Sequence, residues 1–161
     1  MYSPNDLAQI DRMLKKRRIL AIVPACLIVA AAIIVFVYGQ LQRNDHLWKL
    51  TTALTILGVG YGLFFYGVGV RPVRIYRKHV QIMLEGRKRE TTGVFKSFAD
   101  AVSDRDGVQC HAVMLNVGAA DDPEDDRLFY YDAQLPRPDV PLGSMVKILS
   151  NDKMISDFQT L

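Results

Sequence analysis

The chain has 161 residues, half of them hydrophobic, and a formal net charge of +3 at neutral pH. That length suits one domain, or one small domain with an anchor. The two cysteines, Cys26 and Cys110, lie in segments of very different composition, which excludes a disulfide framework within one domain. The charge is segregated, because residues 19–70 carry only three charged side chains, whereas residues 91–161 carry twelve acidic and six basic ones, a net charge of −6.

Two apolar segments account for the scarcity of charge in the first half of the chain. Residues 19–38 and residues 50–70 contain no Asp, Glu, Lys or Arg. As helices, each would span about 30 Å, the thickness of the hydrocarbon core of a bilayer. The charged leader, residues 1–18, and the length of the first segment argue against a cleaved signal peptide. We therefore predict a hairpin of two transmembrane helices, with residues 39–49 as a short external loop.

The basic residues lie on the outer flanks of this hairpin. Residues 1–18 contain five basic and two acidic side chains, and residues 71–90 contain seven basic against two acidic ones. The connecting loop offers only Arg43, with Lys49 at its margin. Because flanks rich in Lys and Arg stay in the cytoplasm, the sequence predicts an integral membrane protein with both termini cytoplasmic.

The second apolar segment contains five glycines within residues 58–70. A phosphate-binding loop requires its glycines between a soluble strand and a helix, so this setting does not predict nucleotide binding. On a helix, Gly58, Gly62 and Gly69 share one face, and small residues at such spacing let helix backbones approach closely. Two interpretations are open: tight packing within the hairpin, and homo-oligomerisation through the second helix.

Residues 71–90 are predicted to form a basic amphipathic connector helix, starting at Pro72 and ending near Gly86. Its cations are candidates for contact with anionic lipid headgroups: Arg74, Arg77, Lys78, Arg87 and Lys88. The alternative is that these cations only fix the topology of the hairpin.

The remaining segment, residues 91–161, changes to short β-like runs separated by turn signals. Five strands are predicted, at residues 91–98, 107–118, 127–133, 144–150 and 154–158. Five short strands in so small a domain most economically close into a barrel, because an open sheet leaves exposed edges. The predicted fold is therefore a membrane α-helical hairpin followed by a small all-β domain on the cytoplasmic side.

The predicted order of elements is membrane helices, a linker and five strands, and the chain includes the stretch Pro141-Leu142-Gly143-Ser144-Met145-Val146-Lys147-Ile148. In this order and in this stretch it resembles the membrane-anchored OB-fold domains of NfeD-type proteins. In that family a small barrel follows the transmembrane helices and ends in a G-x-x-V-x-V strand. The resemblance implies an OB-like five-stranded barrel with a partner-binding or scaffolding role rather than catalysis.

No set of residues predicts catalysis, a cofactor or a metal. Cys110 and His111 are adjacent in a predicted strand, so their side chains point to opposite faces and cannot pair. The acidic loop Asp121–Asp126 has five carboxylates but lacks the alternate ligands, glycine and distal glutamate of an EF-hand, so we expect a solvated hairpin loop. Net negative charge argues against nucleic acid as a partner.

Two functions are compatible with this organisation. The first is a non-enzymatic adaptor or scaffold that holds a small acidic β-barrel at the cytoplasmic face, to bind a partner protein of unknown identity. The alternative is a lipid- or small-ligand-binding domain at the membrane surface, with Phe129, Tyr130 and Tyr131 as the binding surface. Alternation predicts that Phe129 and Tyr131 share one face and Tyr130 takes the other. Aromatic rings packed inside the domain favour the adaptor function, and rings on its surface favour the ligand-binding function.

Overall fold

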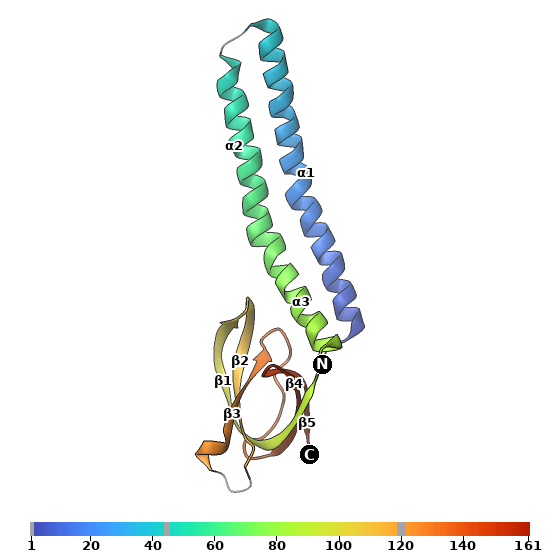
Figure 1. Cartoon of the computed structure of the whole chain (residues 1–161), viewed down its shortest axis with the longest axis vertical. Helices are drawn as coiled ribbons and strands as arrows, with labels where there is room; N and C mark the ends of the chain where they lie inside the picture. Colours follow the sequence, from blue (N-terminus) through green and yellow to red (C-terminus); the bar gives the residue numbers. More distant parts are fainter. Residues whose placement is uncertain (1, 44–45, 119–121) are drawn as a thin grey trace. The chain divides into compact units, whose positions relative to one another are not determined.

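The computed structural model describes residues 2–43, 46–118 and 122–161, and these form two compact units (Figure 1). The helical unit comprises Gln9–Arg74. The sheet unit is discontinuous in sequence, because it combines the first eight residues with Ile75–Leu161. The chain thus contains two long apolar helices followed by a five-stranded sheet, which confirms that part of the prediction.

Helix α1 (Pro4–Gln42) begins with a reciprocal cap. The backbone N–H of Asp6 donates to the Ser3 hydroxyl at 3.3 Å, and the backbone N–H of Ser3 donates to the Asp6 carboxylate at 2.7 Å. This arrangement satisfies N–H groups that have no partner within the helix, while Pro4 occupies the first helical position, where an N–H is not needed. The helix start is therefore encoded within four residues.

Helix α2 (Leu47–Phe65) continues through a π-helical turn, η1 (Tyr66–Val70), into α3 (Arg71–Glu85). The backbone N–H of Arg71 donates to the carbonyl of Tyr66, five residues earlier. The wide turn comes directly before Pro72, whose ring and missing N–H disfavour a regular α-helical turn. The connector helix thus starts close to the predicted position, but it is joined to α2 without a break.

Small residues form the contact between α1 and α2, which run antiparallel in the helical unit (Figure 1). A Cβ at Gly58 would lie 3.0 Å from Cγ2 of Val29, and a Cβ at Gly62 would lie 3.2 Å from Cβ of Ala25. The Tyr61 hydroxyl also donates to the backbone carbonyl of Leu20 at 3.2 Å. Two backbones approach closely because side chains are short on both sides of the contact.

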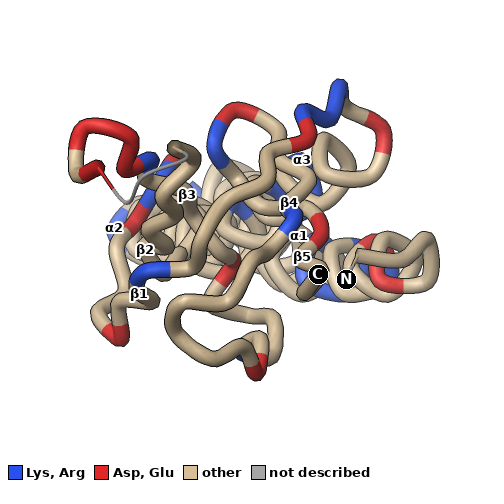
Figure 2. The backbone as a smooth tube through the Cα atoms, turned by 90° about the horizontal axis from the view of Figure 1, so that it is seen from below, with Lys and Arg blue, Asp and Glu red and all other residues tan. Residues whose placement is uncertain are grey.

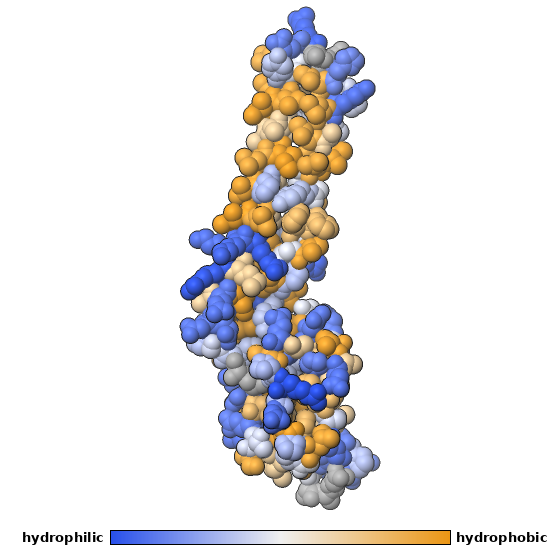
Figure 3. All heavy atoms as spheres, turned by 180° about the vertical axis from the view of Figure 1, so that it is seen from behind, coloured by the Kyte–Doolittle hydropathy of each residue, from blue (hydrophilic) through white to orange (hydrophobic). Residues whose placement is uncertain are grey.

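The large apolar side chains of the helical unit point away from this contact. Leu27 is 66% exposed, Ile34 68%, Ile56 67% and Leu63 72%. Figure 3 shows one face of the resulting surface, on which hydrophobic residues predominate between the polar ends of the two helices. Both helices are long and apolar enough to cross a membrane, by length and composition.

The sheet unit has five strands in the hydrogen-bonded order β1-β2-β3-β5-β4, and β4 pairs in turn with β1. Every pair is antiparallel except β3 with β5. The strands are β1 (Arg89–Arg105), β2 (Val108–Asn116), β3 (Asp126–Asp132), β4 (Met145–Asn151) and β5 (Met154–Thr160). All five predicted strands are present, and the first is longer than predicted at both ends.

Strand β1 is long because it serves two neighbours. Residues 89–94 pair with β4, and residues 94–105 pair with β2 across two irregularities. Gly93 lies where the strand changes neighbour, and a Cβ there would collide with the backbone carbonyl of Asn116. Irregularities of this kind bend and twist a strand, which brings β1 around to both partners.

Alternating side chains of the strands form the main core. Its buried members are Phe95, Val113, Leu115, Phe129, Tyr131, Val146, Ile148 and Ile155. The acidic residues of the unit are divided between its strands and its turns, and Figure 2 shows several of them at the turns. The alternation of buried and more exposed side chains along these strands follows the period of two that the sequence shows.

Candidate functional site

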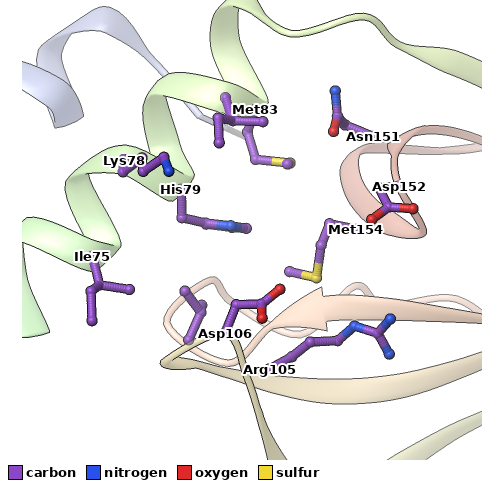
Figure 4. A pocket seen from close by; sticks show the side chains of 11 residues that line it. Ile75, Lys78, His79, Met83, Arg105, Asp106, Asn151, Asp152 and Met154 are labelled. Carbon is purple, nitrogen blue, oxygen red and sulfur yellow. The ribbon is translucent and has the colours of Figure 1, made fainter.

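A cavity of about 440 Å³ lies within the sheet unit, between one face of α3 and two hairpin turns (Figure 4). Helix α3 contributes Lys78, His79 and Met83, the β1–β2 turn contributes Asp106, and β5 contributes Met154. A cavity of this size is in the range of small-ligand sites.

The two turns that border the cavity are tight and have a defined geometry. Asp106 and Gly107 have φ angles of 55° and 80°, and Asp152 and Lys153 have φ angles of 44° and 70°. Two successive residues with positive φ favour the twist of a two-residue hairpin. A Cβ at Gly107 would lie 3.1 Å from Cγ2 of Ile75, so the glycine also lets the first turn approach α3.

An apolar cluster lies beside the cavity and fixes α3 to the sheet. Met83, Val108, Cys110 and Met154 are its buried members. Tyr2, Ile75, Tyr76 and Tyr130 pack against them. The apolar face of the connector helix is thus covered by the sheet, and the N-terminal segment joins the same cluster.

A buried carboxylate, that of Asp132, holds this arrangement together. Its Oδ2 accepts hydrogen bonds from the hydroxyls of Tyr2 at 2.9 Å and Tyr76 at 2.8 Å, and its Oδ1 accepts one from the backbone N–H of Gln134 at 2.9 Å. Burial, reinforced by the negative carboxylate, raises the pKa of both tyrosines above the ordinary value. A buried charge is tolerated where donors surround it, and here the donors come from three separate segments.

The ring of His79 belongs to the same network. Its Nε2 lies 3.1 Å from the Tyr2 hydroxyl, which already donates its proton to Asp132. The hydroxyl oxygen therefore accepts from Nε2–H, and this assigns the lone pair to Nδ1. Burial lowers the pKa of His79, although the Asp132 carboxylate opposes the effect. The imidazole is accordingly neutral near pH 7.

Cys110 is completely buried, and its Sγ lies 3.9 Å from Sδ of Met154. Burial raises the pKa of the thiol to about 11, so it is protonated at neutral pH and a poor nucleophile. The neighbouring His111 is held elsewhere, because its Nδ1 lies 2.9 Å from the carbonyl of Ala99 and its ring packs against Phe98. The two side chains do not form a catalytic pair.

The aromatic residues proposed as a binding surface divide between two faces of β3. Phe129 and Tyr131 are buried in the main core, where the Tyr131 hydroxyl donates to the carbonyl of Pro136 at 2.6 Å. Tyr130 faces the other way, and the guanidinium of Arg105 lies 4.1 Å from its ring centroid. Since the apolar core takes alternate residues, Phe129 and Tyr131 are not available at a surface, and Tyr130 alone is partly accessible.

Of the glycines predicted to pack helices, Gly58 and Gly62 lie at the contact with α1, whereas no atom lies within 4 Å of a Cβ built at Gly69. The carbonyl of Gly69 instead accepts a hydrogen bond from Arg17 at 3.1 Å. The contact within one hairpin thus uses two of the three glycines.

The cations predicted to meet lipid have different surroundings. Arg74 donates weakly to the Tyr66 hydroxyl at 3.5 Å, and Arg77 donates to the side chain of Gln81 at 3.1 Å. Lys78 lines the cavity. Arg87 and Lys88 are exposed and follow the end of α3. Their contact with lipid stays a prediction.

The acidic loop is partly described, since Asp121 lies outside the described residues. The Asp122 carboxylate accepts from the backbone N–H of Glu124 at 3.0 Å and caps a short helix, η2 (Pro123–Asp125). Asp126 lies 3.1 Å from Nζ of Lys96. Across residues 2–43, 46–118 and 122–161, His, Cys, Asp and Glu form no group of three or more that could hold a metal ion.

Comparison of the chain with protein-family models, with curated proteins and with solved structures found no match.

Sequence reasoning missed the network of Tyr2, His79 and Asp132. Tyr2 and Asp132 are 130 positions apart, so no local pattern connects them. The apolar face of residues 72–85 was a usable signal, because a helix with such a face needs a partner, and the sheet was an available one.

Proposed function

We propose that this chain is a membrane-anchored, non-enzymatic adaptor whose helical hairpin lies in the bilayer and whose sheet unit binds a partner protein on the cytoplasmic side. The observation that carries the proposal is which segments of the chain form the sheet unit. It contains both the segment that precedes the hairpin and the segment that follows it, linked at Asp132 by Tyr2 and Tyr76. The unit is therefore fastened to its anchor at two points.

This arrangement supports the proposed topology. If both apolar helices cross the bilayer, the chain returns to the side from which it started, as the link between Tyr2 and Asp132 requires. The exposed apolar side chains of the helical unit support insertion, because soluble surfaces seldom carry so extensive an apolar patch. The basic flanks favour the cytoplasm as the side on which the sheet unit lies.

The strand order supports an OB-like barrel. Five strands that pair as β1-β2-β3-β5-β4 and back to β1, with a parallel contact between β3 and β5, are compatible with a small closed Greek-key barrel. In OB-folds the β2–β3 face and the adjoining loops bind ligands. Here α3 and Tyr2 pack on Cys110 of β2 and Tyr130 of β3, so the protein's own helix fills much of that face.

The positions of the aromatic rings support the adaptor over the alternative. Phe129 and Tyr131 belong to the buried core, so they do not form an exposed binding surface. The buried, protonated thiol of Cys110 supports a non-enzymatic role. The alternative, a small-ligand-binding domain at the membrane surface, is favoured by one observation, the cavity of about 440 Å³ beside α3.

The adaptor is tested by photo-crosslinking in native membranes. A photoreactive amino acid replaces Leu142, which is 71% exposed, and a matched control carries it at the buried Ile148. The adaptor predicts a reproducible protein adduct at position 142 that is absent at position 148. The same photoreactive amino acid is also placed at a second exposed position, Val102. If positions 142 and 102 both form adducts only with lipid or with the chain itself, and with no other protein, the adaptor proposal is overturned.

The topology is tested separately in a chain that lacks Cys26 and Cys110. A cysteine at Gln42 should react with a membrane-impermeant maleimide on intact cells, whereas one at the exposed Ser97 should react only after permeabilisation. Labelling of both positions from the same side would contradict the hairpin topology.

A further inference from the structure

Three side chains with soft donor atoms line the cavity (Figure 4). His79 and Met83 are four residues apart on α3 and therefore share a helix face. Met154 approaches from the start of β5. An imidazole and two thioethers thus border the same space, and they come from two elements that the fold holds together.

A third sulfur, that of Cys110, lies beside one of these donors. Cys110, Met83 and Met154 are 0%, 3% and 9% exposed and belong to one cluster. Sγ of Cys110 is 3.9 Å from Sδ of Met154. Sulfur is weakly hydrated and polarisable, so it can be buried with weak contacts, such as that of Cys110 Sγ with the carbonyl of Val108 at 3.5 Å, and can still bind a soft cation.

Apolar packing alone does not explain the orientation of the His79 ring. The ring donates Nε2–H to the Tyr2 hydroxyl, which in turn donates to Asp132. Histidines that bind metals usually hold the second ring nitrogen in this way, through a hydrogen bond that fixes the tautomer and leads to a carboxylate. Nδ1 keeps its lone pair, and no hydrogen bond among the described residues ends at this nitrogen.

We propose that this cavity binds a soft monovalent cation, Cu(I) or Ag(I), through Nδ1 of His79 and the thioether sulfurs of Met83 and Met154. Thioethers select such cations, whereas Mg²⁺ and Ca²⁺ require oxygen ligands. The rim carries two cations, Lys78 and Arg105, and two carboxylates, Asp106 and Asp152. The charges at the rim therefore balance, and selectivity among cations is determined by the soft donor atoms.

Binding would join α3 to β5 and so reinforce the contact between the connector helix and the sheet. The proposal is independent of the adaptor function, because it concerns a site inside the sheet unit and needs no partner protein. The proton balance is simple, since neither a thioether nor Nδ1 in the assigned tautomer loses a proton on binding.

The experiment is an anaerobic titration of the full-length chain, in detergent micelles, with Cu(I) against a chromophoric Cu(I) chelator. Both cysteines are replaced by alanine, because thiolates would bind Cu(I) by themselves. We expect one Cu(I) per chain and no displacement by excess Zn²⁺. Met83→Leu and Met154→Leu conserve side-chain volume, and each should weaken binding by about 10–100-fold or more, since even loss of a group outside the ligand set costs about that much.

The matched control is Met145→Leu, which changes an exposed methionine of β4 and should leave the affinity unchanged. Tyr2→Phe should weaken binding by about tenfold, because it removes the acceptor that orients His79. X-ray absorption of the Cu(I)-loaded parent provides a second measurement that does not depend on the variants, and it should show sulfur scatterers with one nitrogen. No stoichiometric binding, equal affinity of the Met154→Leu and Met145→Leu chains, or a shell of only nitrogen and oxygen would overturn the proposal and leave an apolar packing cluster.

Discussion

Removing one hydroxyl from the buried Asp132 network should destabilise the sheet unit. Tyr76→Phe keeps the ring in its cluster but deletes the 2.8 Å hydrogen bond to Oδ2, so the carboxylate keeps one side-chain donor, Tyr2, and one backbone donor, Gln134. A hydrogen bond to a charged, buried group contributes about 1.5–3 kcal/mol. We therefore expect a loss of about that size in the free energy of unfolding of the unit.

For a domain of this size, that loss corresponds to a fall in the melting temperature of roughly 6–24 °C. Hydrogen–deuterium exchange of the full-length chain in micelles measures it locally, because amides of β2 and β3 should lose protection while those of α2 do not. The control is Tyr130→Phe, which alters a ring of the same cluster whose hydroxyl has no recorded hydrogen bond in the described residues. Equal exchange in the two variants, or a loss below about 0.5 kcal/mol, would refute the reasoning about Asp132.

Three further predictions concern other parts of the molecule. Gly62→Leu should lower the thermal stability of the hairpin in micelles by about 1–3 kcal/mol through overpacking against Ala25, whereas Gly60→Leu, which has nothing within 4 Å, should not; equal melting curves would contradict the packing. Because the folded-state pKa of His79 lies below its ordinary value of 6.5, the unfolded chain binds more protons, and stability that is present above pH 6.5 should be lost as the pH falls below it. His79→Gln should remove that dependence in urea titrations at several pH values, and an unchanged slope would contradict the pKa direction. Cys110, whose pKa is raised to about 11, should react with a thiol reagent only after denaturation, and fast labelling of the native chain at pH 8 would show that it is accessible.

The elements that the sequence predicted correctly have local signals. Val113 and Leu115, or Val146 and Ile148, alternate with more exposed neighbours, and this period of two reports a strand whatever its partner is. Gly58 and Gly62 report a close contact because their spacing of four places them on one helix face, where small residues let helix backbones approach. In each case the information lies within a few residues.

The candidate site lacks such local signals, which explains why it was missed. Tyr2, Tyr76 and Asp132 are ordinary residues in their own segments, and only the fold brings their polar atoms together. The same holds for Met83 and Met154, which read as core residues of separate elements. Phe129 and Tyr131 were ambiguous for a different reason, because alternation shows that they share a face without showing which face is inside.

The discontinuous sheet unit imposes an order on synthesis of the chain. Tyr2 leaves the ribosome before its acceptor Asp132, which follows 130 residues later. At about 5–20 residues per second, that interval is about 6–26 s. During this time the first apolar helix is synthesised and positioned before the N-terminal residues can form their hydrogen bonds with the sheet. A bulky N-terminal fusion would therefore interfere with the last step of assembly, whereas the same fusion after Leu161 would not.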